Sequence, residues 1–394
     1  MRTTGIYIHI PFCKQACSYC DFYFETSLKH RDGFTEKLIE EIYHYGQSAF
    51  AEMQVSTIYF GGGTPSRLHS EEWTKIMSAL HKNFTISPNA ECTAEVNPED
   101  ITSKYLSGLY DSGINRLSIG IQSFMPSILE FMNRAHGSEA AERALLHISN
   151  SKFDNWTADL IYGNPNQSLE EFKADVYKLL EFKPKHISAY SLTVEPNTRL
   201  GSWVRKKKVV PQDDENVANQ QQWLSDYLES QGFSHYEVSN FAKPGFESVH
   251  NSSYWNHVNY LGLGPSAHSF MWEENSTSAK RWKNVSLLRD YMELNPTKII
   301  QYEEHLSLKT LAEERIMTGL RTKKGLTIGE LSDRYNYNIG EKQHAYVKLL
   351  IQNGYISGED GGIALTKKGL LIADTIILEL ISRQEDVPVL NKQH

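Results

Sequence analysis

Three of the chain's four cysteines stand close together near the N-terminus, as Cys13, Cys17 and Cys20 in the spacing CxxxCxxC. They follow a strand-like run at residues 5–10 and the turn pair Pro11 and Phe12. Three thiolates in one loop can hold a four-iron cluster while one iron stays open to another ligand, as an open position does in catalytic metal sites. The spacing therefore indicates an iron–sulfur cluster with chemistry at its open iron.

Two other interpretations of the cysteines remain open at this point. A zinc site could be completed by His9 or His30, and two of the thiols could form a redox pair with the third as a bystander. Structural zinc usually shows two Cys or Cys/His pairs, and no second pair follows here, so zinc is less favoured. Cys92 lies in an apolar alternating segment, which is typical of a small core residue.

The composition indicates a cytoplasmic protein of two or three domains. The chain has 394 residues, of which 40% are hydrophobic, and only four cysteines, which is the usage of a reducing compartment. Its formal net charge of −8 argues against a nucleic-acid partner, and the basic run at 205–208 is short. No apolar stretch is long enough to span a bilayer, and the first residues lead into a strand, so we expect neither export nor a membrane span.

The first 195 residues alternate short β-branched runs with helical periodicity, the pattern of parallel βα units. Strands are predicted at residues 4–10, 55–60, 91–96, 114–119, 156–162 and 186–192. Helices are predicted at residues 35–45, 71–81, 103–112, 138–148 and 169–180, with Ser70 and Ser168 as N-caps. Six such units predict an α/β fold with a partial (β/α)6 barrel rather than a closed eight-fold barrel.

Polar or glycine-rich residues fall where these strands end. The cysteine loop follows the first strand, the Gly-Gly-Gly-Thr-Pro run at 61–65 follows the second, and Glu95, Gln122 and Asp159 belong to later ones. Taken singly, each has a structural alternative as a turn, a helix cap or a surface charge. Because sites in parallel α/β folds form at the carboxyl ends of the strands, their coincidence predicts one shared site.

These motifs resemble those of the radical S-adenosylmethionine (SAM) proteins related to oxygen-independent coproporphyrinogen III oxidase. The resemblance rests on residues 7–20, 61–65, 121–122, 133–134 and 159–163 together with Glu95. It implies a [4Fe-4S] cluster on Cys13, Cys17 and Cys20, with SAM chelating the fourth iron. It also implies contacts to one or the other of two SAM molecules from Tyr7, Tyr19, Gly62, Gly63, Thr64, Glu95, Gln122, Arg134 and Asp159.

Two features separate this chain from the oxidases of that family. The oxidase pattern has a fourth cysteine two residues beyond the third, where this chain has Phe22. Farther on, His250, Asn251, Tyr254 and Trp255 stand in the pattern HNxxYW, which resembles a motif of heme chaperones in the same family. An imidazole is a common axial ligand of heme iron, and aromatic side chains can stack on a porphyrin. The structural alternative is that His250 is a capping residue among core aromatics.

Beyond about residue 300 the pattern changes. Helices are predicted at residues 307–320, 327–335 and 341–353, followed by a hairpin at 354–357 and 362–366 and a last helix. This order is winged-helix-like, and the acidic chain favours a structural or lid role over DNA binding. We therefore predict a radical SAM core at 1–200, an extension with the heme motif at 201–300, and a C-terminal winged-helix-like α+β domain at 301–394.

Three functions are compatible with these residues. The resemblance favours a heme chaperone that carries heme on His250, with the cluster and SAM controlling assembly or transfer, and with an electron donor and heme-acceptor proteins as partners. The alternative is an oxidase in which reductive cleavage of SAM starts the oxidative decarboxylation of a porphyrinogen. Radical methylation that opens a heme macrocycle is a third possibility. Phe22 and His250 are the residues that distinguish the first two.

Overall fold

The computed structural model describes residues 2–358 and 361–384; residues 359–360 and 385–394, within the predicted C-terminal domain, lie outside this part. Its centre is a sheet in which β1 to β6 lie side by side in chain order and run parallel. These strands are β1 (Thr3–Ile10), β2 (Gln54–Gly62), β3 (Thr85–Val96), β4 (Arg116–Gln122), β5 (Asn155–Tyr162) and β6 (His186–Ser191). The six predicted strands are confirmed.

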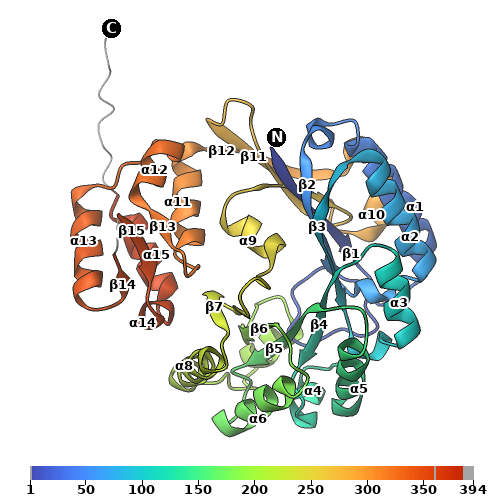
Figure 1. Ribbon diagram of the computed structural model, residues 1–394, viewed down its shortest axis with the longest axis horizontal. Helices are drawn as coiled ribbons and strands as arrows, with labels where there is room; N and C mark the ends of the chain where they lie inside the picture. Colours follow the sequence, from blue (N-terminus) through green and yellow to red (C-terminus); the bar gives the residue numbers. More distant parts are fainter. Residues whose placement is uncertain (1, 359–360, 385–394) are drawn as a thin grey trace.

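Helices follow the strands and cover the outer face of this curved sheet (Figure 1). They are α1 (Arg31–Tyr45), α2 (Ser70–Asn83), α3 (Ser103–Asp111), α4 (Pro126–Phe131), α5 (Ser138–Ser149) and α6 (Leu169–Leu180). Each longer helix turns apolar residues spaced three and four apart toward the sheet, as Phe34, Leu38 and Ile42 do in α1. Strands and helices together confirm the partial (β/α)6 barrel.

The two predicted N-caps have different outcomes. Ser168 caps α6, because its side chain accepts a hydrogen bond from the backbone N–H of Glu171. The prediction for Ser70 is wrong, since Ser70 is the first residue of α2 and His69 occupies the cap position. The Glu72 carboxylate accepts a bond from the N–H of His69 and satisfies that end of the helix.

Short strands extend the sheet beyond both edges of the six-stranded core. Beside β1 lie β9 (Asn259–Leu263), which is parallel to it, and then β10 (His268–Trp272), β11 (Ser278–Asn284) and β12 (Ile300–Ser307), which are antiparallel. Beside β6 lie β8 (Asn240–Ala242) and β7 (Ser234–Glu237). The helices of this region are α7 (Arg199–Arg205), α8 (Asp214–Ser230), α9 (Val249–Trp255) and α10 (Leu288–Glu293). Residues 201–300 thus continue the central sheet.

The sheet does not close on itself, and the C-terminal part of the chain lies at the opening between its edges (Figure 1). This part directly follows β12 at one edge and touches β7 at the other through an antiparallel bridge between Glu237 and Thr322. Helix α9, which carries the HNxxYW residues, lies in the same opening. The motif is therefore positioned between the barrel and the C-terminal part.

The C-terminal part shares an apolar core with residues of β10 to β12, such as Phe270 and Trp272, and has a three-stranded sheet in the order β13-β15-β14. Its elements are α11 (Leu308–Gly319), β13 (Leu326–Thr327), α12 (Ile328–Tyr335), α13 (Glu341–Gln352), β14 (Ile356–Ser357), β15 (Gly362–Leu365), α14 (Lys367–Leu370) and α15 (Ala373–Ser382). This sequence of elements confirms the winged-helix-like order. The division of the whole chain at residues 200 and 300 stays a prediction.

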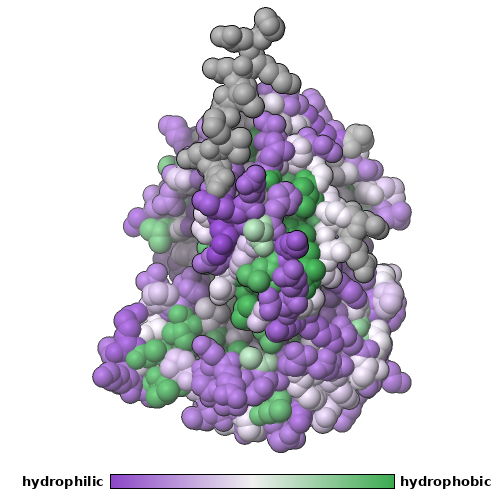
Figure 2. All heavy atoms as spheres, turned by 90° about the vertical axis from the view of Figure 1, so that its left-hand side faces the viewer, coloured by the Kyte–Doolittle hydropathy of each residue, from purple (hydrophilic) through white to green (hydrophobic). Residues whose placement is uncertain are grey.

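The outward side of the C-terminal part carries apolar side chains in the midst of polar ones (Figure 2). Exposed apolar residues of α13 and of the segment from α14 to α15 are Leu349, Ile351, Leu371, Ile372 and Leu378. Among residues 2–358 and 361–384, no helix combines the length and the apolar character needed to cross a membrane.

Candidate functional site

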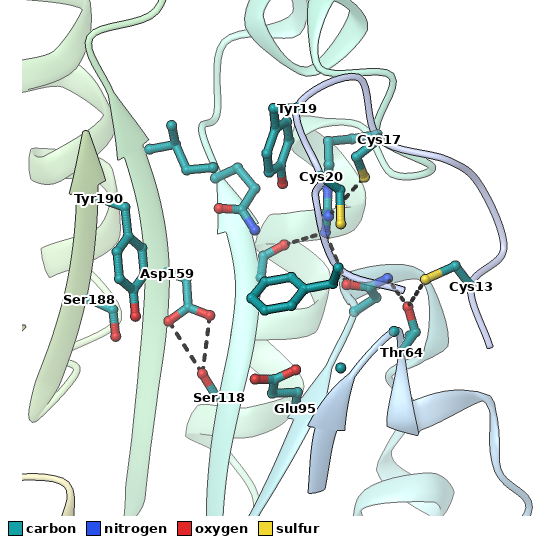
Figure 3. Close-up of a pocket in the computed structure, with 18 of the residues that line it drawn as sticks. Cys13, Cys17, Tyr19, Cys20, Thr64, Glu95, Ser118, Asp159, Ser188 and Tyr190 are labelled. Carbon is teal, nitrogen blue, oxygen red and sulfur yellow. Dashed lines mark hydrogen bonds between the residues drawn. The ribbon is translucent and has the colours of Figure 1, made fainter. Parts of the chain in front are cut away.

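A cavity of about 630 Å³ opens at the carboxyl ends of the barrel strands. The cysteine loop lies on one side of it and the residues of β5 and β6 lie on the other, so that Cys13, Cys17 and Cys20 face Asp159 and Tyr190 across the space (Figure 3). Parallel strands place their binding sites at this end. The structure therefore brings the predicted site residues of several βα units to one place.

The cysteine loop is held by side chains from other units. Thr64 donates a hydrogen bond from Oγ1 to Cys13 Sγ at 3.5 Å, and Arg134 donates from Nη1 to Cys17 Sγ at 3.4 Å. Asn133 donates from Nδ2 to the carbonyl oxygen of Ala16 at 2.7 Å and so fixes the loop backbone. Donors directed at cysteine sulfurs stabilise negative charge on them, as hydrogen bonds do around iron–sulfur clusters.

The donor set fits a four-iron cluster with one open iron. All three cysteines line the same cavity, and no fourth cysteine and no histidine lines it in the described part of the chain. His9, which might complete a zinc site, has both ring nitrogens engaged, Nε2 with the carbonyl oxygen of Tyr23 at 2.9 Å and Nδ1 with the hydroxyl of Tyr7 at 3.3 Å. The imidazole of His9 is thus already committed to the protein.

The glycine run at the end of β2 is required by the chain itself. Gly62 has a φ of +103°, and a Cβ there would lie 2.5 Å from the His9 ring; a Cβ on Gly63 would lie 2.8 Å from the carbonyl oxygen of Ile10. Such contacts are too short for any side chain, so glycine is needed for β2 to pass the start of the cysteine loop. Replacing Gly62 would disturb this loop as well as any ligand.

Two partly buried carboxylates, Glu95 and Asp159, line the cavity. Glu95 accepts a hydrogen bond from the Tyr59 hydroxyl at 2.9 Å, and burial raises its pKa to about 7. Asp159 accepts from the Ser118 hydroxyl at 3.1 Å, and burial raises its pKa to about 6. Both groups can therefore change charge near neutral pH, and each can accept a proton or a hydrogen bond from a bound ligand.

Asn97 is a connecting residue that sequence reasoning did not single out as a site residue. Its Nδ2 donates to Thr64 Oγ1 at 3.1 Å, and its Oδ1 accepts from Arg134 Nη2 at 3.0 Å. It thereby joins the two residues that donate to Cys13 and Cys17. Its position directly after β3, at the carboxyl end of a parallel strand, is the signal by which it could have been found.

The structure brings most of the predicted site residues to the cavity. Those that line it are Cys13, Cys17, Tyr19, Cys20, Gly62, Gly63, Thr64, Glu95, Gln122, Arg134 and Asp159. Tyr7 does not line it but stacks on Tyr59 with ring centres 6.2 Å apart. Lining residues that were not predicted include Asn97, Arg116, Ser118, Thr157, Ser188, Tyr190 and Asn251. Several of these alternate along β4, β5 and β6, which was the available signal.

His250 lies outside the cavity, buried among β1, β2 and α9. Its Nδ1 pairs with Thr57 Oγ1 at 2.8 Å, its Nε2 pairs with the Tyr254 hydroxyl at 2.9 Å, and its ring stacks on Tyr59 at 4.9 Å. Burial lowers its pKa to about 3, so the imidazole is neutral. In this arrangement both ring nitrogens are occupied by protein partners, while the next residue, Asn251, reaches the cavity.

Comparison with protein families agrees with this fold and this cysteine loop. The radical SAM superfamily matches residues 7–178, and the HemN C-terminal domain matches residues 306–372. The chain belongs to the radical SAM superfamily, in the group that carries a HemN C-terminal domain. Membership implies a [4Fe-4S] cluster and SAM as cofactors.

Comparison with individual proteins shows which members of this group the chain is similar to. The chain is 33% identical to the heme chaperone HemW of Lactococcus lactis, with 95% of this chain and 96% of the relative covered. It is 30% identical to the heme chaperone HemW of Bacillus subtilis, with 94% and 97% covered. Its structure is similar to that of coproporphyrinogen III oxidase (HemN) from Escherichia coli, with a TM-score of 0.81, 97% and 91% coverage and 23% identity. The last likeness concerns the fold alone.

Glu95→Gln should weaken SAM binding about tenfold while the iron content stays unchanged. A carboxylate forms charge-assisted hydrogen bonds that an amide cannot replace, and the side-chain partner of Glu95 in the structure is Tyr59, not a cysteine. Because the pKa of Glu95 is about 7, the carboxylate is neutral below this value and charged above it. The difference between wild type and variant should therefore grow as pH rises from 6 to 8. Anaerobic equilibrium dialysis with labelled SAM measures it, and equal affinities at pH 8 would contradict the assignment.

Proposed function

We propose that this protein is a heme chaperone that binds heme and delivers it to acceptor proteins, and that it carries a [4Fe-4S] cluster and SAM in its barrel cavity. The observation that carries the proposal is the HNxxYW segment, present in a chain that is about 30% identical to heme chaperones named HemW over almost its full length. Its position between the barrel and the C-terminal part supports a role in which cavity and motif act together.

Phe22 supports the chaperone over the oxidase. It lies two residues beyond Cys20, where the oxidase pattern has a cysteine, and its side chain lines the cavity while remaining 68% exposed. A phenyl ring offers neither a thiol nor a proton donor to a substrate there. The exposed phenyl ring of Phe22 at the mouth of the cavity also suits contact with a porphyrin face.

Each residue of the cavity has a role in this proposal. Cys13, Cys17 and Cys20 would hold the cluster, which when bound supplies an open iron for the amino and carboxylate groups of SAM and an electron. Thr64 and Arg134 hold the sulfurs through the bonds described above. Tyr19, Gly62, Gly63, Gln122 and Asp159 line the space for SAM, with Glu95 as acceptor for its amino group.

His250 is the proposed axial ligand of heme iron. A neutral imidazole is the form that binds iron, and burial keeps His250 neutral. The Tyr254 hydroxyl occupies Nε2 in the described conformation, so heme binding requires α9 to move or Tyr254 to release this nitrogen. The proposal therefore includes a closed state, described here, and an open state that accepts heme.

Heme-acceptor proteins are the proposed partners, and an electron donor is required if the cluster is reduced. The exposed apolar side chains of α13 to α15 support a protein contact on the outward side of the C-terminal part, because apolar patches of this kind mark interaction sites (Figure 2). The exposed large apolar residues from α13 to α15 are Leu349, Ile351, Leu371, Ile372 and Leu378.

The proposal is tested with anaerobically reconstituted protein and its His250→Ala variant. Wild type should bind heme with a Soret band that shifts in the variant, because loss of an axial imidazole changes the ligand field of the iron. His305→Ala is the matched control, since His305 is a histidine whose side chain is 65% exposed and lies far along the chain. An unshifted band in His250→Ala would contradict the ligand assignment.

The same samples distinguish chaperone from oxidase. With a reductant and SAM, the protein should not convert coproporphyrinogen III over many turnovers, while an authentic oxidase in a parallel tube does. Multiple-turnover formation of protoporphyrinogen that is insensitive to His250→Ala would contradict the chaperone and favour the oxidase. Phe22→Cys is then the informative variant, because it restores the oxidase pattern at this position.

A further inference from the structure

Arg116 is a buried cation whose hydrogen-bonding capacity the protein does not use fully. Its side chain is 2% exposed, yet it lines the barrel cavity. Its Nε is buried and has no hydrogen-bond partner among the described residues, and the closest carboxylate oxygen, Glu91 Oε2, lies 3.8 Å away. A buried guanidinium with unsatisfied donors is costly unless an anion pairs with it.

The position of Arg116 is deeper than the residues proposed to hold SAM. It pairs in register with Thr93 on β3, whereas Ser118 pairs with Glu95 one layer closer to the cavity mouth. The layer with Ser118 also holds Thr157 on β5, since these two residues are register partners. Arg116 thus forms the inner end of the cavity, on the side away from the cysteine loop.

The other groups at this inner end are suited to a small polar ligand. Ser118, Thr157 and Ser188 present hydroxyls from three adjacent strands, and Asn251 presents an amide from α9. Thr157 and Ser188 lie 3.2 Å apart through their hydroxyl oxygens. Ser118 already donates to Asp159 at 3.1 Å and Thr157 already pairs with His186 Nδ1 at 2.7 Å. Arg116 is therefore the group of this end with an unused donor, and Arg can bind a carboxylate through two parallel N–H bonds.

A purely structural role for Arg116 would be to pair with Glu91. This pairing is loose in the structure, because Arg116 Nε lies 3.8 Å from Glu91 Oε2, and both oxygens of Glu91 also accept backbone hydrogen bonds. Oε1 accepts from the N–H of His250 at 2.9 Å, and Oε2 accepts from the N–H of Val249 at 3.1 Å. Glu91 therefore holds the start of α9 and balances part of the charge of Arg116, but it leaves the Nε–H of the guanidinium without a hydrogen-bond acceptor.

We propose that Arg116, with Ser118, Thr157, Ser188 and Asn251, forms a carboxylate-binding subsite at the inner end of the barrel cavity. The shared chemistry of its ligand is a carboxylate next to polar groups. Two sources supply it, a propionate arm of a tetrapyrrole and the amino-acid end of a second adenosyl sulfonium molecule, distinct from the SAM at the open iron. The first source rests on the proposed function, and the second does not. Because Asn251 follows His250, a ligand here would also contact the heme motif.

The test compares ligands with and without the carboxylate on cluster-loaded protein under anaerobic conditions. One pair is heme and heme dimethyl ester, and the other is SAM and decarboxylated SAM. Arg116→Gln removes the charge, Arg116→Lys keeps the charge but not the bidentate geometry, and Arg143→Gln is the matched control, since the Arg143 side chain is 64% exposed. Circular dichroism and iron content verify that each variant folds and carries its cluster.

In one of the two pairs, we expect the preference for the carboxylate-bearing ligand to fall at least tenfold in Arg116→Gln. This preference should fall less in Arg116→Lys and persist in Arg143→Gln. A fall in the heme pair identifies a propionate, and a fall in the SAM pair identifies the amino-acid end. The subsite is overturned if Arg116→Gln keeps the wild-type preference for the carboxylate-bearing ligand in both pairs. If Arg116→Gln does not fold, the same result in Arg116→Lys overturns it. Wild type that fails to bind heme at all refutes the proposed function, while the SAM pair still decides the subsite.

Discussion

Replacing Cys13, Cys17 or Cys20 by alanine should remove the iron–sulfur cluster completely. Wild type purified without oxygen should contain about four irons and four sulfides per chain, because a site with three protein thiolates holds one four-iron cluster. Each of these cysteines lines the same cavity, and the lining offers no further thiol and no imidazole within the described residues. Iron and sulfide analysis together with the absorbance near 400 nm measures the loss.

Cys92→Ala is the matched control for the cluster variants. Cys92 is 5% exposed, belongs to the apolar core between β2 and β4, and does not line the cavity. Its loss should cost the protein some stability, on the order of 1 kcal/mol, because a small buried side chain is shortened. It should leave the iron content unchanged. Loss of iron in Cys92→Ala with an intact fold would overturn the assignment of the ligands.

The barrel could be predicted from the sequence because its strands are covered on both faces by the rest of the chain. Ile6, Ile8 and Ile10 of β1 are fully buried, and such short β-branched segments that alternate with amphipathic helices indicate parallel strands. The added strands beyond β1 and β6 could not be predicted in this way. In β11, charged residues such as Lys280 and Arg281 interrupt the apolar pattern, and the strand becomes stable through its two antiparallel neighbours.

The residues of the candidate site were likewise predictable only in part. Residues at strand ends, such as Glu95 and Asp159, were predictable because a polar residue there faces the open end of a barrel. Arg116 was missed, although it alternates with Ser118 along β4, because it stands at the start of the strand and not at the carboxyl end where sites are expected. The environment of His250 depends on Thr57, which is 193 positions away in the chain. No local pattern contains such a contact.

Helix α9 links the two parts of the molecule through both of its ends. At its start, the Glu91 carboxylate on β3 accepts from the N–H groups of Val249 and His250. At its end, Arg315 on α11 donates from Nη1 to the carbonyl oxygen of Trp255 at 3.0 Å. The barrel therefore satisfies the free N–H groups of the helix and the C-terminal part satisfies a free carbonyl. Movement of either part would therefore shift α9 and change the surroundings of His250.

Arg315→Ala should therefore destabilise the protein by about 3 kcal/mol, because it breaks a largely buried pair and frees a helix carbonyl. The Arg315 side chain is 5% exposed and binds Glu330 through Nε and Nη2 at 2.7 and 3.1 Å. Urea unfolding measures the cost. Arg383→Ala, which removes an exposed pair with Glu379 on α15, is the matched control and should cost less than about 0.5 kcal/mol.

The same variant tests whether the C-terminal part restrains the heme motif. If Arg315 holds the end of α9, the backbone amides of α9 should exchange with deuterium faster in Arg315→Ala than in wild type, and those of α2 should not change. Heme should then associate faster, since Tyr254 releases His250 Nε2 more often when α9 is loose. A lowered stability with unchanged exchange in α9 would mean that Arg315 serves only the C-terminal core. In that case the closed state of His250 does not depend on the contact between Arg315 and α9.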